Sequence, residues 1–274
     1  MKPSRLESIS GYVVLIGLAL ATLVPFVSIV LAALQPSGSL VSGLQVPHTL
    51  HFENFREAWT AANFGALLKS SLIISGTVVP LSVVMATLAG YALATMRVPA
   101  AGLIFAAFLA GLTLPVELII IPLYYDLRDL HLTNNYLGVI LAESALFMPF
   151  GVFWMRTHFQ STPRDIIEAA EMDGANPRTI LRRVLLPLSG PSLSSLAVLI
   201  FLWSWNQFLL VLIMMQDPSK RTAPAGLGFF VGEHINNIPV LCAATLIVIL
   251  PVFVIYLIFQ RKFISGMLQG AIRG

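Results

Sequence analysis

Six long apolar runs constrain this chain more than any other feature of its sequence. An α-helix needs about 20 apolar residues to cross the hydrocarbon core of a bilayer. Each run reaches that length without Lys, Arg or Asp, and two contain one glutamate each, Glu117 and Glu143. We therefore expect an all-α membrane protein with six transmembrane helices, at residues 11–34, 70–96, 100–125, 136–155, 191–216 and 238–260.

The composition supports this expectation and excludes soluble classes of protein. The chain is 57% hydrophobic and 11% charged, whereas about a quarter of a soluble domain is charged. The net charge of +3 comes from basic residues that form no continuous stripe with aromatic residues, so we expect no nucleic-acid partner. Cys242 is the only cysteine, so the chain has no internal disulfide, and we expect it to bind no metal.

The distribution of Lys and Arg predicts how the helices are oriented. With the N-terminus inside, eleven of the sixteen basic residues lie in inner segments and five in outer ones. The positive-inside rule therefore predicts that both termini are cytoplasmic. The first apolar run is too long for the core of a cleaved signal peptide, so we expect it to remain as a helix. Residues 35–69 are then an external loop, with a short helix around residues 54–59.

Several catalytic and nucleotide-binding motifs are missing from the sequence. It contains no Gly-x-x-x-x-Gly-Lys-Ser/Thr loop, so the chain does not bind ATP by that route. It also lacks the zinc-protease and serine-hydrolase motifs, and all five histidines fall in predicted loops, His158 among them. We expect neither an enzyme nor a bound cofactor in this chain.

The longest inner segment, between the fourth and fifth runs, predicts two short helices. Thr162 as the N-cap, Pro163 at the first helical position and Asp165 in the first turn mark the start of one helix. This helix is expected to run to Met172. Gly174 is expected to stop it, because glycine adopts the left-handed conformation at little cost.

The second short helix is expected to begin at Asn176 and Pro177. Arg178 and Arg182 lie one turn apart on it, and an apolar stripe follows them. Pro187 is expected to end or kink this helix as the chain enters the fifth run. On periodicity alone, a pair of linker helices resting on the membrane surface is the simpler interpretation.

A spacing pattern in this segment resembles a known family. Glu-Ala-Ala, three residues, Gly, nine residues and a closing Val-Leu-Leu-Pro is similar to the EAA loop of permease subunits of bacterial ABC importers, whose usual closing is Ile-x-Leu-Pro. The loop's usual isoleucine is replaced by Val184. Three further segments resemble the carbohydrate-uptake branch of that family, which includes the maltose and trehalose permeases. They are Tyr91-Ala92-Leu93-Ala94, Trp205-Asn206-Gln207-Phe208, where Gln207 replaces an acid, and the tail at residues 259–274.

The resemblance implies a type I ABC importer permease fold and a set of partners. These are a second permease subunit, expected to be a different chain, two cytoplasmic ATPases that bind ATP and Mg, and an external solute-binding protein. It also implies that the EAA helix is a coupling helix that docks on the ATPase. The residues implied for this coupling loop are Glu168, Ala169, Ala170, Asp173, Gly174, Arg178 and Pro187.

The resemblance also implies an organisation and a location. Residues 1–66 would form an N-terminal tail, the first helix and the external loop. Residues 67–262 would form the core permease domain with the coupling loop at 157–190, and residues 263–274 a cytoplasmic tail. The expected location is the cell membrane of a bacterium or archaeon, which is the inner membrane in a Gram-negative cell.

Polar side chains inside the apolar runs are candidates for the solute path. Glu143 and Glu117 lie toward the outer ends of their runs, so each either reaches water by snorkelling or contacts the solute. Asn206 and Gln207 lie near the middle of the fifth run. They either hydrogen-bond a neighbouring helix or line the solute path.

The absence of Lys and Arg from the middle of the runs favours a neutral solute over an anion. The carbohydrate-branch resemblance also implies a sugar or polyol, and amide, carboxyl and aromatic side chains suit hydroxyl-rich solutes. Two alternatives stay open from the sequence. One is a self-powered secondary carrier or channel, which would leave the EAA spacing without a purpose. The other is a membrane sensor or assembly factor.

Overall fold

The structure is a computed structural model that describes the backbone of residues 5–41, 43–232 and 237–271. Every regular element in these ranges is a helix, which confirms the all-α prediction. The first four residues and the last three of the predicted tails lie outside the described residues. The helices are α1 (Arg5–Ala33), α2 (Glu53–Ala61), α3 (Phe64–Thr95), α4 (Ala101–Thr113), α5 (Val116–Asp129), α6 (Tyr136–Gln160), α7 (Arg164–Met172), α8 (Pro177–Thr179), η1 (Ile180–Leu185), α9 (Leu186–Leu188), α10 (Gly190–Trp205), α11 (Leu209–Met214), η2 (Pro218–Lys220), α12 (Ala223–Gly226), α13 (Gly228–Gly232) and α14 (Ile238–Ala271).

Four of the six predicted transmembrane runs are single helices. They correspond to α1, α3, α6 and α14, each of which contains a segment long and apolar enough to cross a membrane. Two bent helix pairs bring the number of candidate spans in the described part of the chain to six if each pair counts as one span. The chain is therefore a multi-pass membrane protein.

The third predicted run is wrong as a single helix. It consists of α4 and α5, which meet at an angle of 105°. The break lies at Leu114 and Pro115, whose backbones are extended, with ψ angles of 125° and 127°. Proline lacks an amide N–H and disfavours the helical conformation of the residue before it. Here these effects end α4 rather than kinking it.

The fifth predicted run is also wrong as a single helix. α10 has 16 residues, about 24 Å at 1.5 Å per residue, which is shorter than the roughly 30 Å core of a bilayer. Residues 206–208 then interrupt the helix before the short α11 begins. At the interruption, Asn206 donates from its side-chain Nδ2 to the carbonyl of Leu202 at 2.8 Å. Asparagine competes in this way for the backbone groups of a helix.

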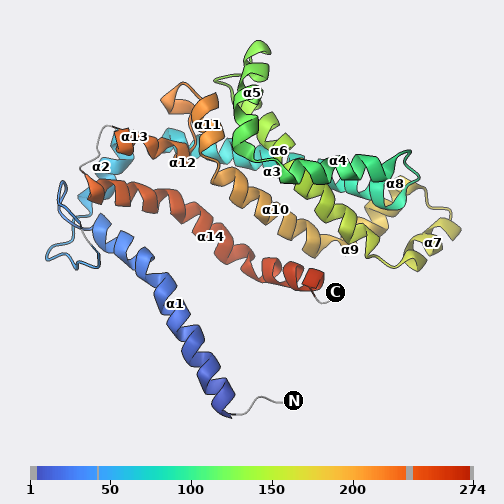
Figure 1. Cartoon of the computed structure of the whole chain (residues 1–274), viewed down its shortest axis with the longest axis horizontal. Helices are drawn as coiled ribbons and strands as arrows, with labels where there is room; N and C mark the ends of the chain where they lie inside the picture. Colours follow the sequence, from blue (N-terminus) through green and yellow to red (C-terminus); the bar gives the residue numbers. More distant parts are fainter. Residues whose placement is uncertain (1–4, 42, 233–236, 272–274) are drawn as a thin grey trace. The chain divides into compact units, whose positions relative to one another are not determined.

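The chain forms two compact units. One comprises Met1–Gly65 and Gly226–Pro251, and the other comprises Ala66–Ala225 and Val252–Gly274. The second unit contains all the residues that the sequence proposes for coupling and for the solute path. Within it, α6 packs against both α4 and α10 (Figure 1).

Small residues allow α3 and α6 to approach closely in the second unit. A Cβ atom added to Gly90 of α3 would lie 2.7 Å from Met155 Cβ and 2.8 Å from the backbone nitrogen of Arg156. A Cβ added to Gly151 of α6 would lie 2.7 Å from Ala86 Cβ. Close backbone contact through small residues is a main source of helix association in membranes. The two helices therefore form a tightly packed pair.

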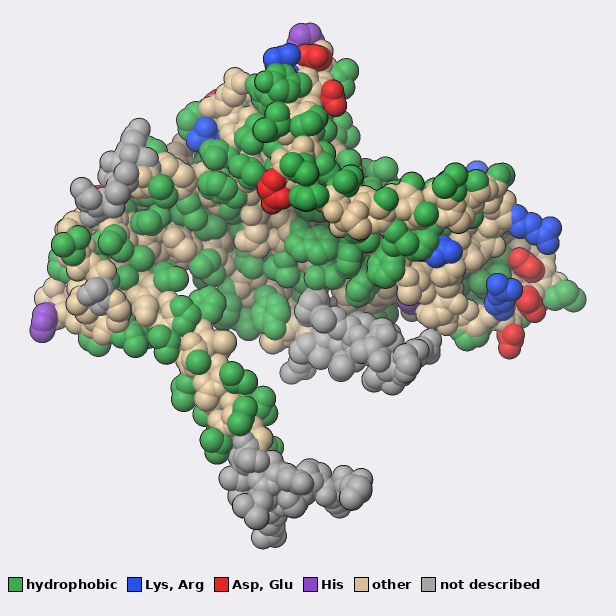
Figure 2. All heavy atoms as spheres, in the orientation of Figure 1, with side chains coloured by type: hydrophobic (Ala, Val, Ile, Leu, Met, Phe, Trp, Pro, Cys, Tyr) green, Lys and Arg blue, Asp and Glu red, His purple; other side chains and the backbone are tan. Residues whose placement is uncertain are grey.

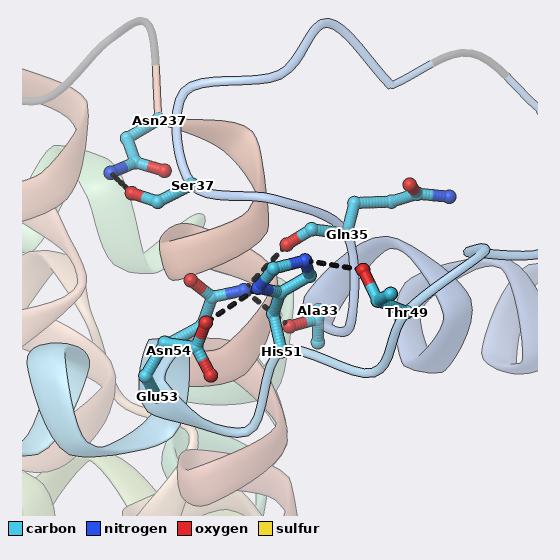
Figure 3. A network of polar contacts seen from close by, with 8 residues as sticks. All are labelled: Ala33, Gln35, Ser37, Thr49, His51, Glu53, Asn54 and Asn237. Carbon is cyan, nitrogen blue, oxygen red and sulfur yellow. Dashed lines mark hydrogen bonds and ion pairs between the residues drawn. The ribbon is translucent and has the colours of Figure 1, made fainter.

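In the first unit, a buried asparagine joins the end of α1 to α2. Asn54 donates from Nδ2 to the carbonyl oxygens of Ala33 at 2.9 Å and Gln35 at 2.7 Å (Figure 3). These bonds satisfy carbonyl groups that the end of a helix leaves unpaired. His51 Nδ1 lies 2.5 Å from Glu53 Oε1, and this hydrogen bond holds the pKa of Glu53 below its ordinary value. The short helix expected around residues 54–59 is confirmed as α2.

The close approach of α3 and α6 gives a testable prediction. We expect Gly90→Ala to lower the stability of the protein by about 1–3 kcal/mol, because overpacking forces a shift of neighbouring backbone. The measurement is the thermal unfolding midpoint in detergent. Gly76→Ala is the matched control on the same helix, since a Cβ there meets nothing within 4 Å. Equal midpoints for the two variants would contradict the close approach.

Candidate functional site

The EAA segment forms a short helix at one end of the second unit. α7 spans Arg164–Met172, with Asp165 in its first turn. Thr162 is wrong as the predicted N-cap. Pro163 occupies that position with a ψ of 129°, and the Thr162 hydroxyl instead donates to the carbonyl of His158 at 3.4 Å. The start of α7 is therefore tied back to the end of α6.

Gly174 ends α7 as predicted. It has a φ of 77°, in the left-handed region that costs glycine little. The Gly174 N–H donates to the Glu171 carbonyl at 2.9 Å, and the Ala175 N–H donates to the Ala170 carbonyl at 3.0 Å. Together these bonds form a Schellman motif, which satisfies the last carbonyl groups of the helix. The turn therefore depends on a residue without a side chain.

Most of the predicted coupling residues face outward. Ala170 is the exception, since it is partly buried and packs with Ile167 against the hydrophobic core. Charged side chains gather around α7 at this end of the second unit (Figure 2). The helix thus rests on the unit by one face and leaves the other exposed. The exposed members of the predicted set are Glu168, Ala169, Asp173, Gly174, Arg178 and Pro187.

A cavity of about 710 Å³ lies behind α7, between that helix and the ends of α3 and α6. Arg97, Arg164, Glu168 and Glu171 bring charges of both signs to its lining. No ion pair within 4.0 Å joins these four residues in the part of the chain that the structure describes. The four charged groups therefore line the cavity without neutralising one another directly.

The second predicted short helix is present, but its path differs from the expectation. Asn176 caps it, with Oδ1 accepting from the Thr179 N–H at 2.9 Å. α8 then passes into the π-helix η1 and into α9. Pro187 neither ends nor kinks this segment, because it occupies the first turn of α9, where proline is tolerated. The 78° bend toward α10 comes two residues later, at Ser189.

Glu143 lies inside the second unit rather than at a water-facing surface. Its side chain is on α6 and is fully buried. Oε2 accepts a hydrogen bond from the hydroxyl of Ser204 on α10, and Oε1 has no partner among the described residues. Burial of a carboxyl group in a membrane helix is costly unless a neighbouring group compensates. The hydrogen bond between Glu143 and Ser204 therefore links α6 to α10.

The other three candidate path residues lie at the helix breaks. Glu117 is exposed in the first turn of α5, just after the break between α4 and α5. Asn206 is exposed and Gln207 is partly buried at the break between α10 and α11. The side-chain bond described for Asn206 stays within its own helix rather than reaching a neighbouring one. The structure thus places these polar groups where the backbone changes direction.

Three side chains that fasten the loop segment to the spans escaped the sequence interpretation. Tyr91 donates from its hydroxyl to the Pro177 carbonyl at 2.9 Å. Trp154 donates from Nε1 to the Ser192 hydroxyl at 2.9 Å. His158 lies on α6, not in the predicted loop, and its Nε2 is 2.9 Å from the Ser189 hydroxyl. Trp154 and His158 are four residues apart in the sequence, so a helix would place both side chains on one face, and this spacing could have indicated a shared contact.

Comparison with known proteins decides the family. The family described as the inner membrane component of binding-protein-dependent transport systems matches residues 82–268. The chain belongs to this family. A probable ABC transporter permease of Pyrococcus horikoshii is 35% identical, over 93% of this chain and 94% of that protein. The diacetylchitobiose uptake system permease NgcG of Streptomyces coelicolor is 32% identical, over 98% of this chain and 90% of that protein. Both are named as permeases, so this chain is a transport subunit rather than an enzyme.

A solved structure confirms the type I ABC importer permease fold. One chain of a bacterial ABC transporter involved in the import of the acidic polysaccharide alginate matches with a TM-score of 0.80. The sequence identity is 23%, and the match covers 96% of this permease and 99% of that chain. The permease therefore has the fold that the EAA spacing implied.

The buried bond between Glu143 and Ser204 gives a second prediction. We expect Ser204→Ala to destabilise the permease by about 1–3 kcal/mol, because it leaves a buried carboxyl group without its donor. The thermal unfolding midpoint in detergent is the measurement. Ser194→Ala on the same helix is the control, since that partly buried hydroxyl bonds only to its own helix backbone. A Ser204→Ala midpoint no lower than that of the control would refute the role of this bond.

Proposed function

We propose that this permease forms half of the translocation path of an ATP-driven sugar importer. The proposed substrate is an oligosaccharide, a disaccharide or a polyol. The proposal draws on relatives named for diacetylchitobiose uptake, trehalose transport and melibiose, raffinose and stachyose import. It is also supported by the absence of Lys and Arg from the six apolar runs, since an anionic solute would favour a countercharge.

The observation that carries the coupling proposal is the geometry of α7. The helix is exposed on one face, held to the second unit by the other, and closed by a glycine turn with a φ of 77°. We infer that α7 docks on a cytoplasmic ATPase subunit. Glu168, Ala169 and Ala170 would lie on the docking helix, and Asp173, Gly174, Arg178 and Pro187 on the segment that follows. Small side chains permit close approach, and unpaired charges around the cavity offer partners to the ATPase.

The two helix breaks are the proposed places of solute contact. Broken helices in transporters expose polar backbone and side-chain groups to a water-filled path. Glu117, Asn206 and Gln207 combine such a position with exposed or partly exposed side chains. Amide and carboxyl groups can hydrogen-bond sugar hydroxyls. Glu143 is buried away from such a path, so its proposed contribution is to hold α10 in place.

The assembly that follows from the family has four kinds of component. This permease would pair with a second permease, expected to be a different chain, and with two ATPases. An external solute-binding protein would deliver the sugar. ATP and Mg would bind to the ATPases. The proposed location is the cell membrane of a bacterium or archaeon, with both termini in the cytoplasm.

The test of the sugar proposal is uptake by the complete complex. The permease is purified in mild detergent from cells that make it naturally, and co-purifying proteins are identified by mass spectrometry. The complex is then reconstituted in liposomes with its binding protein and offered radiolabelled diacetylchitobiose, trehalose, melibiose and raffinose. ATP-dependent accumulation of one of these sugars supports the proposal. Recovery of the permease without any ATPase, or uptake that needs no ATP, would overturn it.

Gly174→Asp is the sharpest single variant for coupling. We expect normal amounts of the variant in the membrane, because a side chain at this exposed turn meets nothing within 4 Å. We also expect uptake per ATP hydrolysed to fall about tenfold, which corresponds to about 1.4 kcal/mol of lost docking. The added charge and the strained φ act directly at the turn after α7.

The matched control for this variant is Gly43→Asp. Gly43 also has a positive φ, 63°, and open space for a side chain, but it lies in the loop between α1 and α2. We expect its uptake to ATP ratio to stay near the wild-type value. A Gly174→Asp variant with a normal ratio would remove the assignment of this loop to coupling.

A further inference from the structure

The bend between α9 and α10 interrupts the helical segment that connects α7 to the transmembrane part of the second unit. The two segments meet at 78° at Ser189, and the π-helix η1 lies just before them. π-helical turns often mark functional sites in helices. If α7 moved, the angle at this bend could change while α10 stayed in place, unless another element held the segments on both sides of the bend. The structure provides that element on α6.

Trp154 and His158 of α6, here called the α6 clamp, hold the two sides of this bend. They are four residues apart and therefore share one helix face, while Ser189 and Ser192 are three residues apart and share another. His158 Nε2 lies 2.9 Å from the hydroxyl of Ser189, the bend residue itself. Trp154 Nε1 donates to the hydroxyl of Ser192 at 2.9 Å and to its carbonyl oxygen at 3.1 Å. One bond thus fixes the bend and the other fixes the first turn of α10.

The direction of the His158 bond follows from the Ser189 hydroxyl. That hydroxyl has a single proton, which it donates to the Leu185 carbonyl at 2.7 Å. It can therefore only accept from His158, so Nε2 carries the proton in this arrangement. His158 is linked through one hydroxyl both to the bend and to the last turn of η1. The three groups form a continuous chain from η1 to α6.

The contact between α6 and α10 continues beyond the clamp. Phe147 and Phe150 of α6 pack against Trp203 of α10, with ring centroids 5.8 and 4.8 Å apart. At the far end, Glu143 holds Ser204, next to the break where Asn206 lies. Polar bonds therefore fasten both ends of α10 to the same neighbour, with aromatic rings between them. The contact between the two helices therefore extends from the bend at Ser189 to the residue two positions before Asn206.

We propose that Trp154 and His158 are positioning residues that transmit the movement of α7 across the Ser189 bend into α10. This inference rests on the proposed function, because it requires α7 to be driven by an ATPase. The proposed role of both residues is exerted through Ser189 and Ser192. Their effect is to make the loop segment, α6 and α10 move together. Without the α6 clamp, an ATP-driven movement of α7 changes the angle of the bend and leaves α10 in place.

The test compares variants of the clamp in the complete complex, reconstituted in liposomes with its ATPases and binding protein. His158→Met removes the hydrogen bond at similar size, and His158→Gln keeps a side-chain N–H that can reach Ser189. Trp154→Phe removes the indole donor but keeps a ring against Phe150. Ser189→Ala removes the acceptor, and Ser194→Ala is the control on α10.

The measured quantity is the ratio of sugar taken up to ATP hydrolysed, using the sugar of the four-sugar panel with the highest wild-type uptake. We expect this ratio to fall about fivefold in His158→Met, Trp154→Phe and Ser189→Ala. A change of this size corresponds to one hydrogen bond that favours the state in which α7 and α10 move together over the state in which they do not. We expect His158→Gln to recover more than half of the wild-type ratio. We expect the ATP hydrolysis rate to stay near wild type and the thermal midpoint to fall no further than it does in Ser204→Ala, since each clamp variant also loses a hydrogen bond.

The possible outcomes separate this inference from the proposed function. A wild-type complex that takes up none of the sugars with ATP overturns the proposed function and the inference with it. A working wild type with an unchanged ratio in His158→Met and Trp154→Phe overturns only the inference. The inference also fails if uptake and hydrolysis fall together, or if His158→Gln is as impaired as His158→Met, because both results indicate a merely structural role.

Discussion

The need to pair every backbone N–H and C=O group inside a lipid bilayer determines most of this structure. Water is absent from the hydrocarbon core, so a chain that crosses it must be helical or must compensate each interruption. This permease interrupts its helices at Leu114 and Pro115, at Ser189 and after Trp205. At two of these places a side chain adds a second hydrogen bond to a carbonyl group that already accepts from a backbone N–H: Ser189 bonds to Leu185 and Asn206 to Leu202. The interruptions are therefore stabilised features of the fold, and the candidate functional residues lie beside them.

The close packing of α3 against α6 gives those interruptions a stable support. Gly90 and Gly151 bring the two backbones together without intervening side chains, so neither helix can shift far without losing contact. α6 also holds α10 through the α6 clamp and Glu143. The helical segments between the bends are thus joined to α6 by close packing and by side-chain hydrogen bonds. Such an arrangement suits a protein that must change shape in a membrane without exposing its backbone to lipid.

The sequence predicted elements that depend on residues nearby in the chain better than elements that depend on contacts with other helices. Four of the six apolar helices, the glycine stop after α7 and the helix start at Asn176 and Pro177 depend on nearby residues, and the structure has them all. The breaks in the third and fifth runs were not predicted, because proline and asparagine occur inside many unbroken membrane helices. The Thr162 cap failed since its hydroxyl bonds to the end of α6 instead. That partner becomes visible only once α6 is known to extend past Met155. The roles proposed for the coupling and path residues remain predictions.

The contrast between Glu143 and Glu117 shows why side-chain type alone could not assign these sites. Both are single glutamates in apolar runs toward their outer ends, and both had the same two interpretations from the sequence. Their positions differ because α6 continues past Glu143 with α10 packed against it, whereas Pro115 turns the chain just before Glu117 and leaves that carboxyl exposed. A buried carboxyl must find a donor from another helix, and Ser204 supplies it. An exposed carboxyl in the first turn of α5 is already favoured by the N-terminal end of that helix. The same residue type therefore joins two helices in one place and is exposed at a helix start in the other.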